Sequence, residues 1–520
     1  MRKTLMGGLV ILYLFAITQR AWVTEDSYIT FRTIDNLSHG YGLTWNVAER
    51  VQAYTHPLWL FLLSLFHLFT HEFFLTSIFT SLALSIATVV LYTWRLARSA
   101  RLAAVGLLIL TFSNAFVDYS TSGLENPLNH LLLVCFFFLY FKLESSPRKI
   151  WLLWLVCACV GITRPDSILL CLPVLLLETI QPYAVSQPPG QPKAWRRIGS
   201  AITGLLPLLL WEAFSLFYYG FPFPNTAYAK LDTGIPAGNL IHQGFLYLAN
   251  SICWDPLTLL VIGGALICSL FYRSRESIPL SIGVVIYLVY LVSIGGDFMA
   301  GRFLAAPLLV AAILIGRLPG QALFDRRASF LYPGIILVGL VAPLPAIFPG
   351  EARNPMSFID PHGVADERRF YAETNSLLSL RYTDDPPDHP WRWEGTAARN
   401  AGEKVIIRDS IGMFGLEAGP GVYILDPLAL ADPLLARLPI QSGPWRIGHF
   451  RREIPEGYLE TLVSGQNQIA DPNLRSYYEA LSMITRGPLW DMNRLGEIWK
   501  MNAGKYQYLL NAYTQSLVYR

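Results

Sequence analysis

The sequence predicts an α-helical polytopic membrane protein with a small C-terminal α/β domain outside the membrane. Of 520 residues, 53% are hydrophobic and only 15% are charged, and the mean hydropathy is +0.38. An average soluble domain carries roughly 25% charged residues. The apolar residues fall into many separate runs, which indicates repeated membrane crossings and not one large soluble core.

Net charge and cysteine usage argue against a nucleic-acid-binding protein and against a disulfide-rich one. The formal net charge is +3, and no basic block indicates a nucleic-acid partner. The six cysteines lie in or beside apolar runs, without histidines or further cysteine pairs at metal-binding spacing. We therefore expect buried apolar thiols and no disulfide framework. No cofactor is required by these patterns, and a divalent cation is an open alternative that no ligand spacing supports.

The basic residues set the predicted topology. Arg2 and Lys3 precede the first apolar run, and no small-x-small cleavage site follows it, so we expect a retained signal anchor with a cytoplasmic N-terminus. The positive-inside rule places five further basic clusters in the cytoplasm as well. These clusters are Arg95/Arg98/Arg101, Lys142/Arg148/Lys149, Lys193/Arg196/Arg197, Arg273/Arg275 and Arg317/Arg326/Arg327.

The apolar runs agree with this topology if segment 57–70 is re-entrant or interfacial, which leaves about eleven transmembrane helices. That segment is also short for a full span, which needs roughly 17–25 residues. The runs are 5–19, 57–70, 73–94, 102–117, 125–141, 150–163, 167–180, 198–218, 255–272, 278–294, 303–316 and 329–348.

Two domains follow from the topology. Residues 1–348 form the membrane domain, whose first external loop is 20–72. Residues 349–520 lie outside, and they contain the strand-like stretches "EKVIIRDS" and "GVYILDP" before polar helical sequence. Acids and bases at the strand ends are often ties within loops. In this tail, the residues of this kind are Arg408, Asp409, Asp426, Asp432, Arg437 and His449.

Six polar motifs fall on the external side in this topology. They are "TEDSYITFR", "QAYTHPLW", "STSGLENPL", "TRPDS", "FPFPNTAYAK" and "GGDFMAGRF". Ionisable groups at membrane depth are costly and usually mark a pathway or a site. Because these motifs come from separate loops on one face, we expect one polar cavity there. A transporter would distribute such groups through the spans and on both faces, so the pattern favours an enzyme.

Glu25 and Asp26 open the first of these motifs, directly after a membrane helix. Apolar residues then recur every three positions as far as Leu37, which predicts an amphipathic helix along the interface. Carboxylates at a helix start also suit the helix dipole, so Glu25 is explained equally well as a cap. We interpret Asp26 as the catalytic carboxylate and Glu25 as its supporting acid.

The other motifs supply groups that suit a lipid-phosphate-linked donor. Guanidinium forks bind phosphate, although Arg164 and Arg302 can equally pair with the nearby Asp166 and Asp297. Such a donor needs a carboxylate for the acceptor hydroxyl, cations for the departing phosphate and an apolar groove for the prenyl chain. We assign donor-phosphate binding to Arg164, Arg302, Lys230 and His56, and substrate binding to Tyr54, Thr55, Glu125, Asn225 and Asp297.

The first external loop, "EDSYITFRTIDNLSHGYGLTWNVAERVQAYTHPLW", resembles the corresponding loop of a set of GT-C glycosyltransferases. Further blocks match in the same order: "TSGLENPL", "TRPDS", "PFPNTAYAK", "GGDFMAGR" and "ILDPLALADPLLAR…GHFRREIP". The set includes mycobacterial terminal β-arabinofuranosyltransferases and a pilin arabinosyltransferase. The family's loop carboxylate corresponds to Asp26, and Glu25 stands where many members have a second Asp.

The resemblance implies a GT-C fold with a periplasmic C-terminal domain in the bacterial inner membrane. It also implies a polyprenyl-phosphate donor, best matched by D-arabinofuranose, and a cell-envelope glycan or surface protein as acceptor. Ala48, Ala53 and His56 depart from the pattern, which has Gly, Gly and Asn there. These departures leave another lipid-linked sugar (mannose, galactose or aminoarabinose) as an alternative. A lipid-linked sugar transporter and a structural partner in an envelope assembly are two further alternatives.

Overall fold

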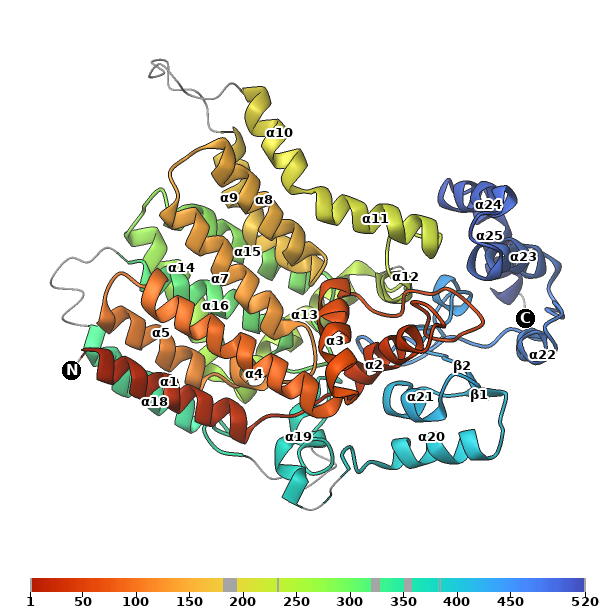
Figure 1. Ribbon diagram of the computed structural model, residues 1–520, viewed down its shortest axis with the longest axis horizontal. Coiled ribbons are helices and arrows are strands. Elements are labelled where there is room, and N and C mark those ends of the chain that lie inside the picture. The colour runs from red at the N-terminus through yellow and green to blue at the C-terminus, as the bar shows by residue number, and fades with distance from the viewer. Residues whose placement is uncertain are drawn as a thin grey trace.

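A computed structural model describes residues 2–180, 194–231, 233–318, 328–349, 358–381, 383 and 385–518 (Figure 1). Lys193, Arg326 and Arg327 of the predicted basic clusters lie outside these residues. The bundle contains α1 (Arg2–Gln19), α2 (Glu25–Ser38), α3 (Pro57–Thr70), α4 (Phe74–Leu91), α5 (Ala100–Phe112), α6 (Asn114–Asp118), α7 (Asn126–Lys142), α8 (Pro147–Gly161), α9 (Ile168–Ile180), α10 (Ala194–Gly204), α11 (Leu206–Tyr218), α12 (Asn225–Leu231), α13 (Ala237–Trp254), α14 (Pro256–Phe271), α15 (Ser277–Ser293), α16 (Ala305–Gly316) and α18 (Leu331–Val341).

The core of this bundle is built around α16, which packs against α5 and α14. Its sequence, "AAPLLVAAILIG", has no polar side chain, and it is buried from Ala305 to Leu314. Small residues let neighbouring backbones approach closely in such a bundle. Gly106 on α5 shows this directly, because a Cβ there would overlap the Tyr92 ring, whose hydroxyl donates to the Ala312 carbonyl at 3.1 Å.

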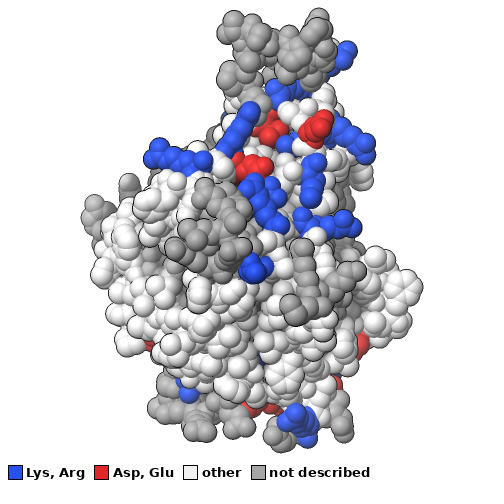
Figure 2. All heavy atoms as spheres, turned by 90° about the vertical axis from the view of Figure 1, so that its left-hand side faces the viewer, with Lys and Arg blue, Asp and Glu red and all other residues white. Residues whose placement is uncertain are grey.

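The described basic clusters meet at one end of the bundle, at the left of Figure 1. Arg98 and Arg317 come from two different clusters and both pair with Glu276, at 2.8 and 2.7 Å. Figure 2 looks at this side: Lys and Arg side chains gather in its upper part, above a broad surface without charges. The polar loops of the predicted site lie at the opposite end of the helices.

The structure is helical, as predicted, but most of its apolar helices are short. The helix α4 continues through a π-helical turn as far as Leu96. Among the described residues, this stretch, Phe74–Leu96, is the one unbroken helix that is long and apolar enough to cross a membrane. Up to three spans result if each of two bent helix pairs is taken as one. The predicted number of about eleven crossings is therefore not reached by length and composition.

Between residues 198 and 272 the structure shows two details that the apolar runs did not predict. The expected single span 198–218 is broken into α10 and α11, bent by 49°, because Pro207 lacks the N–H that a continuous helix needs. The chain before 255, where no apolar run was predicted, contains the long helix α13. It meets α14 at an angle of 111°, and Pro256 starts α14.

The C-terminal part surrounds a small parallel sheet of β1 (Val405–Ile407) and β2 (Tyr423–Leu425), with Val405 opposite Tyr423. Its helices are α19 (Glu367–Tyr371), α20 (Pro390–Asn400), α21 (Gly412–Ala418), α22 (Tyr458–Ser464), α23 (Pro472–Arg486), α24 (Met492–Asn502) and α25 (Gln507–Val518). One apolar cluster joins Ile29 and Trp45 of the first loop to Phe414 and Ile424 of this part. The two regions thus share a core.

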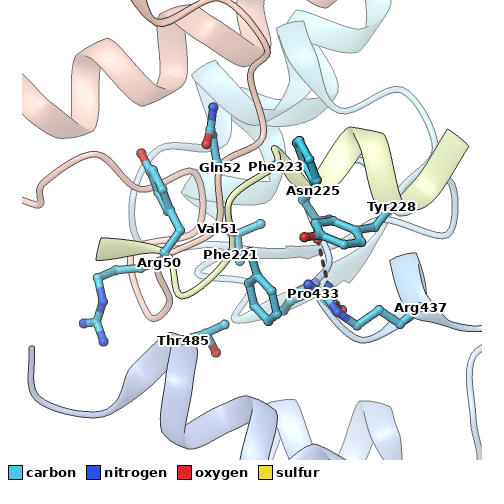
Figure 3. A pocket seen from close by; sticks show the side chains of 11 residues that line it. Arg50, Val51, Gln52, Phe221, Phe223, Asn225, Tyr228, Pro433, Arg437 and Thr485 are labelled. Atoms are coloured by element: carbon cyan, nitrogen blue, oxygen red, sulfur yellow. Dashed lines mark hydrogen bonds between the residues drawn. The ribbon is translucent and has the colours of Figure 1, made fainter. Parts of the chain in front are cut away.

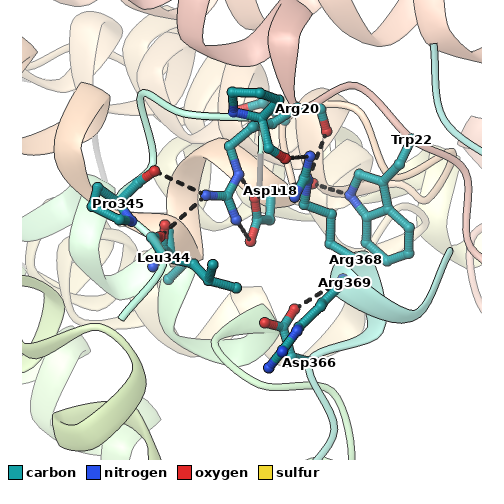
Figure 4. A network of polar contacts seen from close by, with 12 residues as sticks. Arg20, Trp22, Asp118, Leu344, Pro345, Asp366, Arg368 and Arg369 are labelled. Carbon is teal, nitrogen blue, oxygen red and sulfur yellow. Dashed lines mark hydrogen bonds and ion pairs between the residues drawn. The ribbon is translucent and has the colours of Figure 1, made fainter. Parts of the chain in front are cut away.

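A buried ion pair anchors the start of the first loop (Figure 4). The Arg20 guanidinium donates to both carboxylate oxygens of Asp118, at 2.7 and 2.9 Å, and also to the carbonyls of Leu344 and Pro345. Arg368 on α19 donates to the Arg20 carbonyl at 3.3 Å. The end of α1, α6, the chain after α18 and the C-terminal part are therefore joined immediately before α2.

Candidate active site

The helix α2 carries Asp26 into the site. Its start is bound to the loop before α7, where the Thr24 N–H donates to the Ser122 carbonyl at 2.9 Å. Gly123 allows this close approach: its φ is +76°, and a Cβ there would lie 2.7 Å from the Ser27 hydroxyl. Asp26 is half-buried, and its carboxylate has no hydrogen bond or ion pair within the described part of the chain. It is free to accept a proton from a substrate.

Glu125 lies at the centre of a network that connects four of the six predicted motifs. Its Oε1 accepts from Arg164 Nη1 at 3.0 Å and from Arg302 Nη2 at 3.1 Å, and its Oε2 lies 3.2 Å from His56 Nδ1. The Glu125 carboxylate is buried, and Arg302, His56 and Arg164 surround it. Glu125 is therefore a fixed anion whose charge is already paired with groups of the protein itself.

His56 connects this network to α2. Its Nε2 lies 2.8 Å from the Thr30 hydroxyl, one turn of α2 beyond Asp26, while Nδ1 faces Glu125. A histidine Nδ1–H that donates to a carboxylate leaves Nε2 to accept from the threonine hydroxyl. Both ring nitrogens are thus occupied by protein groups, so His56 fixes the distance between α2 and Glu125.

Arg164 and Arg302 differ in how many of their guanidinium N–H groups have a partner in the protein. The Arg164 guanidinium pairs with Asp166 at 3.0 Å as well as with Glu125, and it lies 4.3 Å from the centre of the Phe303 ring. Arg302 uses Nη2 for Glu125, whereas its Nη1 contacts only the Met299 sulfur at 3.6 Å and its buried Nε has no partner among the described groups. Arg302 has the greater capacity to bind an incoming anion.

Lys230 and Asp297 extend the site toward the C-terminal part. Lys230 Nζ lies 5.6 Å from the centre of the Phe298 ring, and it forms no ion pair within the described residues. Asp297 accepts from the Phe298 N–H at 2.8 Å through Oδ1, while its buried Oδ2 has no partner there. Burial raises the pKa of Asp297, and the positive charges of Arg302, Lys230 and Arg164 counteract the rise.

Glu25 does not cap its own helix, and its role as a supporting acid stays a prediction. Thr24 is the N-cap residue of α2. The buried Glu25 carboxyl instead accepts a hydrogen bond from the Gly412 N–H at the start of α21. Burial, and then the charge of Asp26, raise the pKa of Glu25 to about 8. A carboxyl with this pKa is mostly neutral at pH 7.

Three predicted substrate-binding residues are bound to the protein or lie beside the network. The Asn225 amide donates to the carbonyls of Ala429 and Asp432 and accepts from Arg437, beside the hollow shown in Figure 3. The buried Tyr54 hydroxyl lies 2.8 Å from that of Tyr219. Thr55 is half-buried and lies 3.4 Å from His56 Nδ1. Asn225 and Tyr54 therefore hold the loops together and offer no free group.

The C-terminal part contributes residues that the sequence motifs did not identify. The charges of Asp26, Glu25, Asp297 and Arg446 act on the pKa of the Glu367 carboxyl. The Arg446 guanidinium donates to the Gly363 carbonyl at 2.7 Å, and its buried Nη2 has no partner among the described groups. Stretch 358–371 contains no recognisable motif.

Only the pairing of distant backbones places this stretch here. The Ala365 N–H donates to the Phe298 carbonyl at 2.7 Å, beside Asp297. Immediately before α2, the Val23 N–H donates to the Asn375 carbonyl at 2.9 Å, and the Asn375 side chain donates to the Val23 carbonyl.

The predicted interpretation of the tail acids as loop ties fits their contacts. Asp426 accepts from the N–H groups of Leu428 and Leu430, at 2.8 and 2.6 Å. Asp432 accepts from the Leu435 N–H at 2.7 Å and from the Tyr458 hydroxyl at 2.9 Å. Within the described ranges, no group of three or more His, Cys, Asp or Glu side chains is arranged to hold a metal ion.

Over most of its length the chain is similar to curated glycosyltransferases, which confirms the predicted resemblance and the predicted enzyme class. The relatives are two proteins named terminal β-(1→2)-arabinofuranosyltransferase. The one from Mycobacterium tuberculosis is 26% identical, with 86% of this chain and 84% of the relative covered. The one from Corynebacterium glutamicum is also 26% identical, with 83% and 73% covered.

Similar solved structures include an oligosaccharyltransferase from Archaeoglobus fulgidus, at 13% identity, covering 81% of this chain and 62% of that chain. Another is ArnT from Cupriavidus metallidurans bound to undecaprenyl phosphate, at 11% identity, covering 81% and 85%. Both have a TM-score of 0.47, which is too low to bear on the site. No family model matches the chain.

Proposed function

We propose that the protein transfers D-arabinofuranose from a polyprenyl-phosphate donor to a hydroxyl group of a cell-envelope glycan or surface protein. The observation that carries this proposal is the contrast inside the site. Asp26 is a carboxylate without a protein partner, and it lies beside a network in which Glu125 fixes Arg302 while part of its guanidinium stays unused. A free base beside a fixed cation suits transfer from a phosphate-linked donor.

In the proposed reaction, Asp26 accepts the proton of the acceptor hydroxyl as its oxygen attacks the anomeric carbon of the sugar. The bond between that carbon and the phosphate oxygen breaks, and prenyl phosphate leaves with the electron pair. Arg302 stabilises the charge that develops on the departing phosphate, and Lys230 binds the donor phosphate both before and during the reaction. Arg164, paired with Glu125 and Asp166, holds this arrangement in place, and His56 links Glu125 to Thr30 of α2.

The same proposal places the site outside the cytoplasmic membrane of a bacterium. The basic clusters at the opposite end of the bundle support a cytoplasmic orientation for that end and for the N-terminus. About eleven crossings, with α3 interfacial, give this orientation for a bilayer-spanning region 1–348 and an external region 349–520. The exposed apolar side chains on α3 and α11 suit contact with lipid; among them are Leu65, Phe69 and Leu210.

A purified-protein assay with a panel of polyprenyl-phosphate sugars tests the proposal. The polyprenyl-phosphate arabinofuranose donor is expected to give acceptor-dependent release of prenyl phosphate at the highest rate. Mannose, galactose and aminoarabinose donors are the alternatives, and a higher rate with one of them would replace the sugar while keeping the reaction class. Movement of intact donor between leaflets without release of prenyl phosphate would contradict the reaction class.

A further inference from the structure

The helix α11 has an apolar stripe along its exposed side. Its exposed members recur at spacings of three or four residues and are Leu206, Leu209, Leu210, Ala213 and Leu216. Phe217 follows Leu210 by seven residues, so it lies on the same side of the helix. Unlike the exposed members, Phe217 is half-buried, and it lies where α11 reaches the C-terminal part (Figure 1). A group of the C-terminal part therefore covers the last residue of the stripe.

That group is Trp490, which lies two residues before α24. The centre of its ring lies 4.9 Å from the centre of the Phe217 ring. Trp490 thus occupies the surface onto which α11 turns its leucines. It is nevertheless 81% exposed, because it covers Phe217 with only a small part of its own ring. The apolar surface of α11 therefore continues onto the C-terminal part.

Hydrogen bonds fix α24 at the end of α11. The Arg494 Nη2 donates to the carbonyl of Tyr218, the last residue of α11, at 2.8 Å. Two turns further along α24, the Asn502 amide donates to the Gly220 carbonyl at 2.8 Å. The last carbonyls of a helix have no donor within that helix, so α24 supplies partners that α11 needs. The position of α24 beside α11 is thus set by the protein itself.

The helix α24 carries an apolar stripe of its own. The stripe follows the helical repeat and consists of Met492, Gly496, Trp499 and Ala503. Met492 and Trp499 are 77% and 72% exposed. Beside the stripe, Lys500 and Glu497 pair with each other at 2.7 Å, so the stripe itself carries no charge. Large exposed apolar side chains that lie together in this way mark an interaction surface.

We propose that Trp490 and the stripe of α24 lie in the outer interface of the lipid bilayer and attach the C-terminal part to it. This inference rests on the proposed function, which places the leucines of α11 against lipid. Trp490 extends that lipid-facing surface, and α24 is fixed directly beside it. Tryptophan favours the membrane interface, because its ring is apolar and its N–H is polar. A helix with one apolar stripe suits a position parallel to the membrane surface.

The test measures the depth of spin labels in the full-length protein, reconstituted into vesicles of phosphatidylethanolamine and phosphatidylglycerol. A Cys253→Ser background removes the exposed native thiol, and labelled background protein supplies the blank spectrum. Gly496→Cys places a label in the middle of the stripe, where a Cβ meets no atom within 4 Å. Oxygen and a water-soluble nickel chelate report the depth by power saturation. We expect this label about 5–10 Å below the level of the lipid phosphates.

Two further labels supply the controls. Glu403→Cys lies at an exposed position of the C-terminal part, away from α24, and its label should be fully accessible to the nickel chelate. Ala213→Cys lies on the stripe of α11, and its label should be deeper than the one at residue 496. If Gly496→Cys does not fold, Ala503→Cys at the end of the same stripe should give the same interfacial depth.

A label at residue 496 that is as accessible to the nickel chelate as the one at residue 403 would overturn the inference. Spin–spin coupling between labels at residue 496, with protection from both reagents, would overturn it as well, because a second copy of the chain would then cover the stripe. A label at residue 213 in water would overturn the membrane placement of α11. No donor is used, so failure of sugar transfer is a separate outcome.

Discussion

Glu125 and Asp26 are two acids of one site, and the protein treats them in opposite ways. Glu125 has a side chain that is 2% exposed and binds Arg164, Arg302 and His56. Asp26 is half-buried and has no hydrogen bond or ion pair within the described chain. A fully paired acid supports its neighbours but cannot react, whereas an unpaired acid is costly to keep and is available to a substrate.

In the proposed mechanism, this contrast distinguishes a rigid frame from Asp26, the proposed reacting group. The frame consists of Glu125, Arg164, Arg302 and His56, each held by residues distant in sequence. Because its charges are oriented before the substrate arrives, little reorganisation is needed during the reaction. Substitutions in the frame should therefore reduce stability and activity together, while substitution of Asp26 should reduce activity alone.

The largest effect is expected from Asp26→Asn. The amide cannot accept the acceptor proton, and kcat should fall by roughly 10²–10⁴-fold. Release of prenyl phosphate by purified protein measures the loss, and the elution volume and Tm should match wild type. Asp35→Asn is the control: Asp35 lies on the same helix, and within the described chain its carboxylate pairs only with His39, at 3.3 Å, so activity should be retained. A wild-type rate for Asp26→Asn would remove Asp26 from the proposed mechanism.

Glu125→Gln should have the next largest effect, and it should lower both stability and activity. Removal of the buried anion leaves Arg164 and Arg302 without a counter-charge, which costs about 3–5 kcal/mol for a broken buried pair. We expect a Tm lower by several degrees in detergent, together with a fall in kcat/KM of about 10–100-fold.

Glu276→Gln is a close control for this change. Glu276 also binds two arginines, Arg98 and Arg317, but its side chain is 40% exposed. Exposed pairs contribute about 0–1 kcal/mol, so both Tm and activity should stay near wild type. Equal effects of the two substitutions would mean that the burial of Glu125 does not make its ion pairs more important than the exposed pairs of Glu276.

Lys230→Gln should have a smaller and more selective effect. If this unpaired cation binds the donor phosphate before and during the reaction, donor KM should rise about tenfold while kcat changes little. Lys230→Arg should restore most of the affinity. Lys404→Gln, at an exposed position of the tail, should leave KM unchanged. A fall in kcat with unchanged KM would instead assign Lys230 to the departing phosphate alone.

Glu25→Gln should have the smallest effect at pH 7. With a pKa of about 8, the wild-type carboxyl is already mostly neutral there, and a glutamine oxygen can accept the same hydrogen bond from Gly412. Activity at pH 7 should stay within about threefold of wild type. The proteins should diverge only as pH rises through 8 and the glutamate ionises. A large loss at pH 7 would make Glu25 a second catalytic acid.

The meeting of several site motifs could be predicted from the sequence. Charge parity assigns each loop to one side of the membrane, so Asp26, Glu125 and Arg302 were expected on a common face. The pairing within that face could not be predicted, because a guanidinium fork fits a carboxylate and a phosphate equally well. The structure resolves this for Arg164, which is bound to two carboxylates.

Other features had no local signal. Asn225 has a type of side chain that suits a sugar hydroxyl, yet the carbonyls that occupy it come from residues about 200 positions away. Helix α13 was missed because polar residues such as Asn239 and Gln243 interrupt its apolar pattern. Glu367 was missed because its position depends on backbone pairing of its segment with two distant loops.

The pairing of residues 21–23 with residues 375–377 also has a consequence for the time at which the enzyme becomes active. The two partners in the Asn375–Val23 hydrogen bond are 352 positions apart. At 5–20 residues per second, a ribosome needs roughly 20–70 s to make the intervening chain. During this interval α1 can already be inserted, but the edge that carries Asp26 lacks its partner. In a newly made chain, the helix that carries Asp26 is therefore present well before the segment that pairs with the residues in front of it.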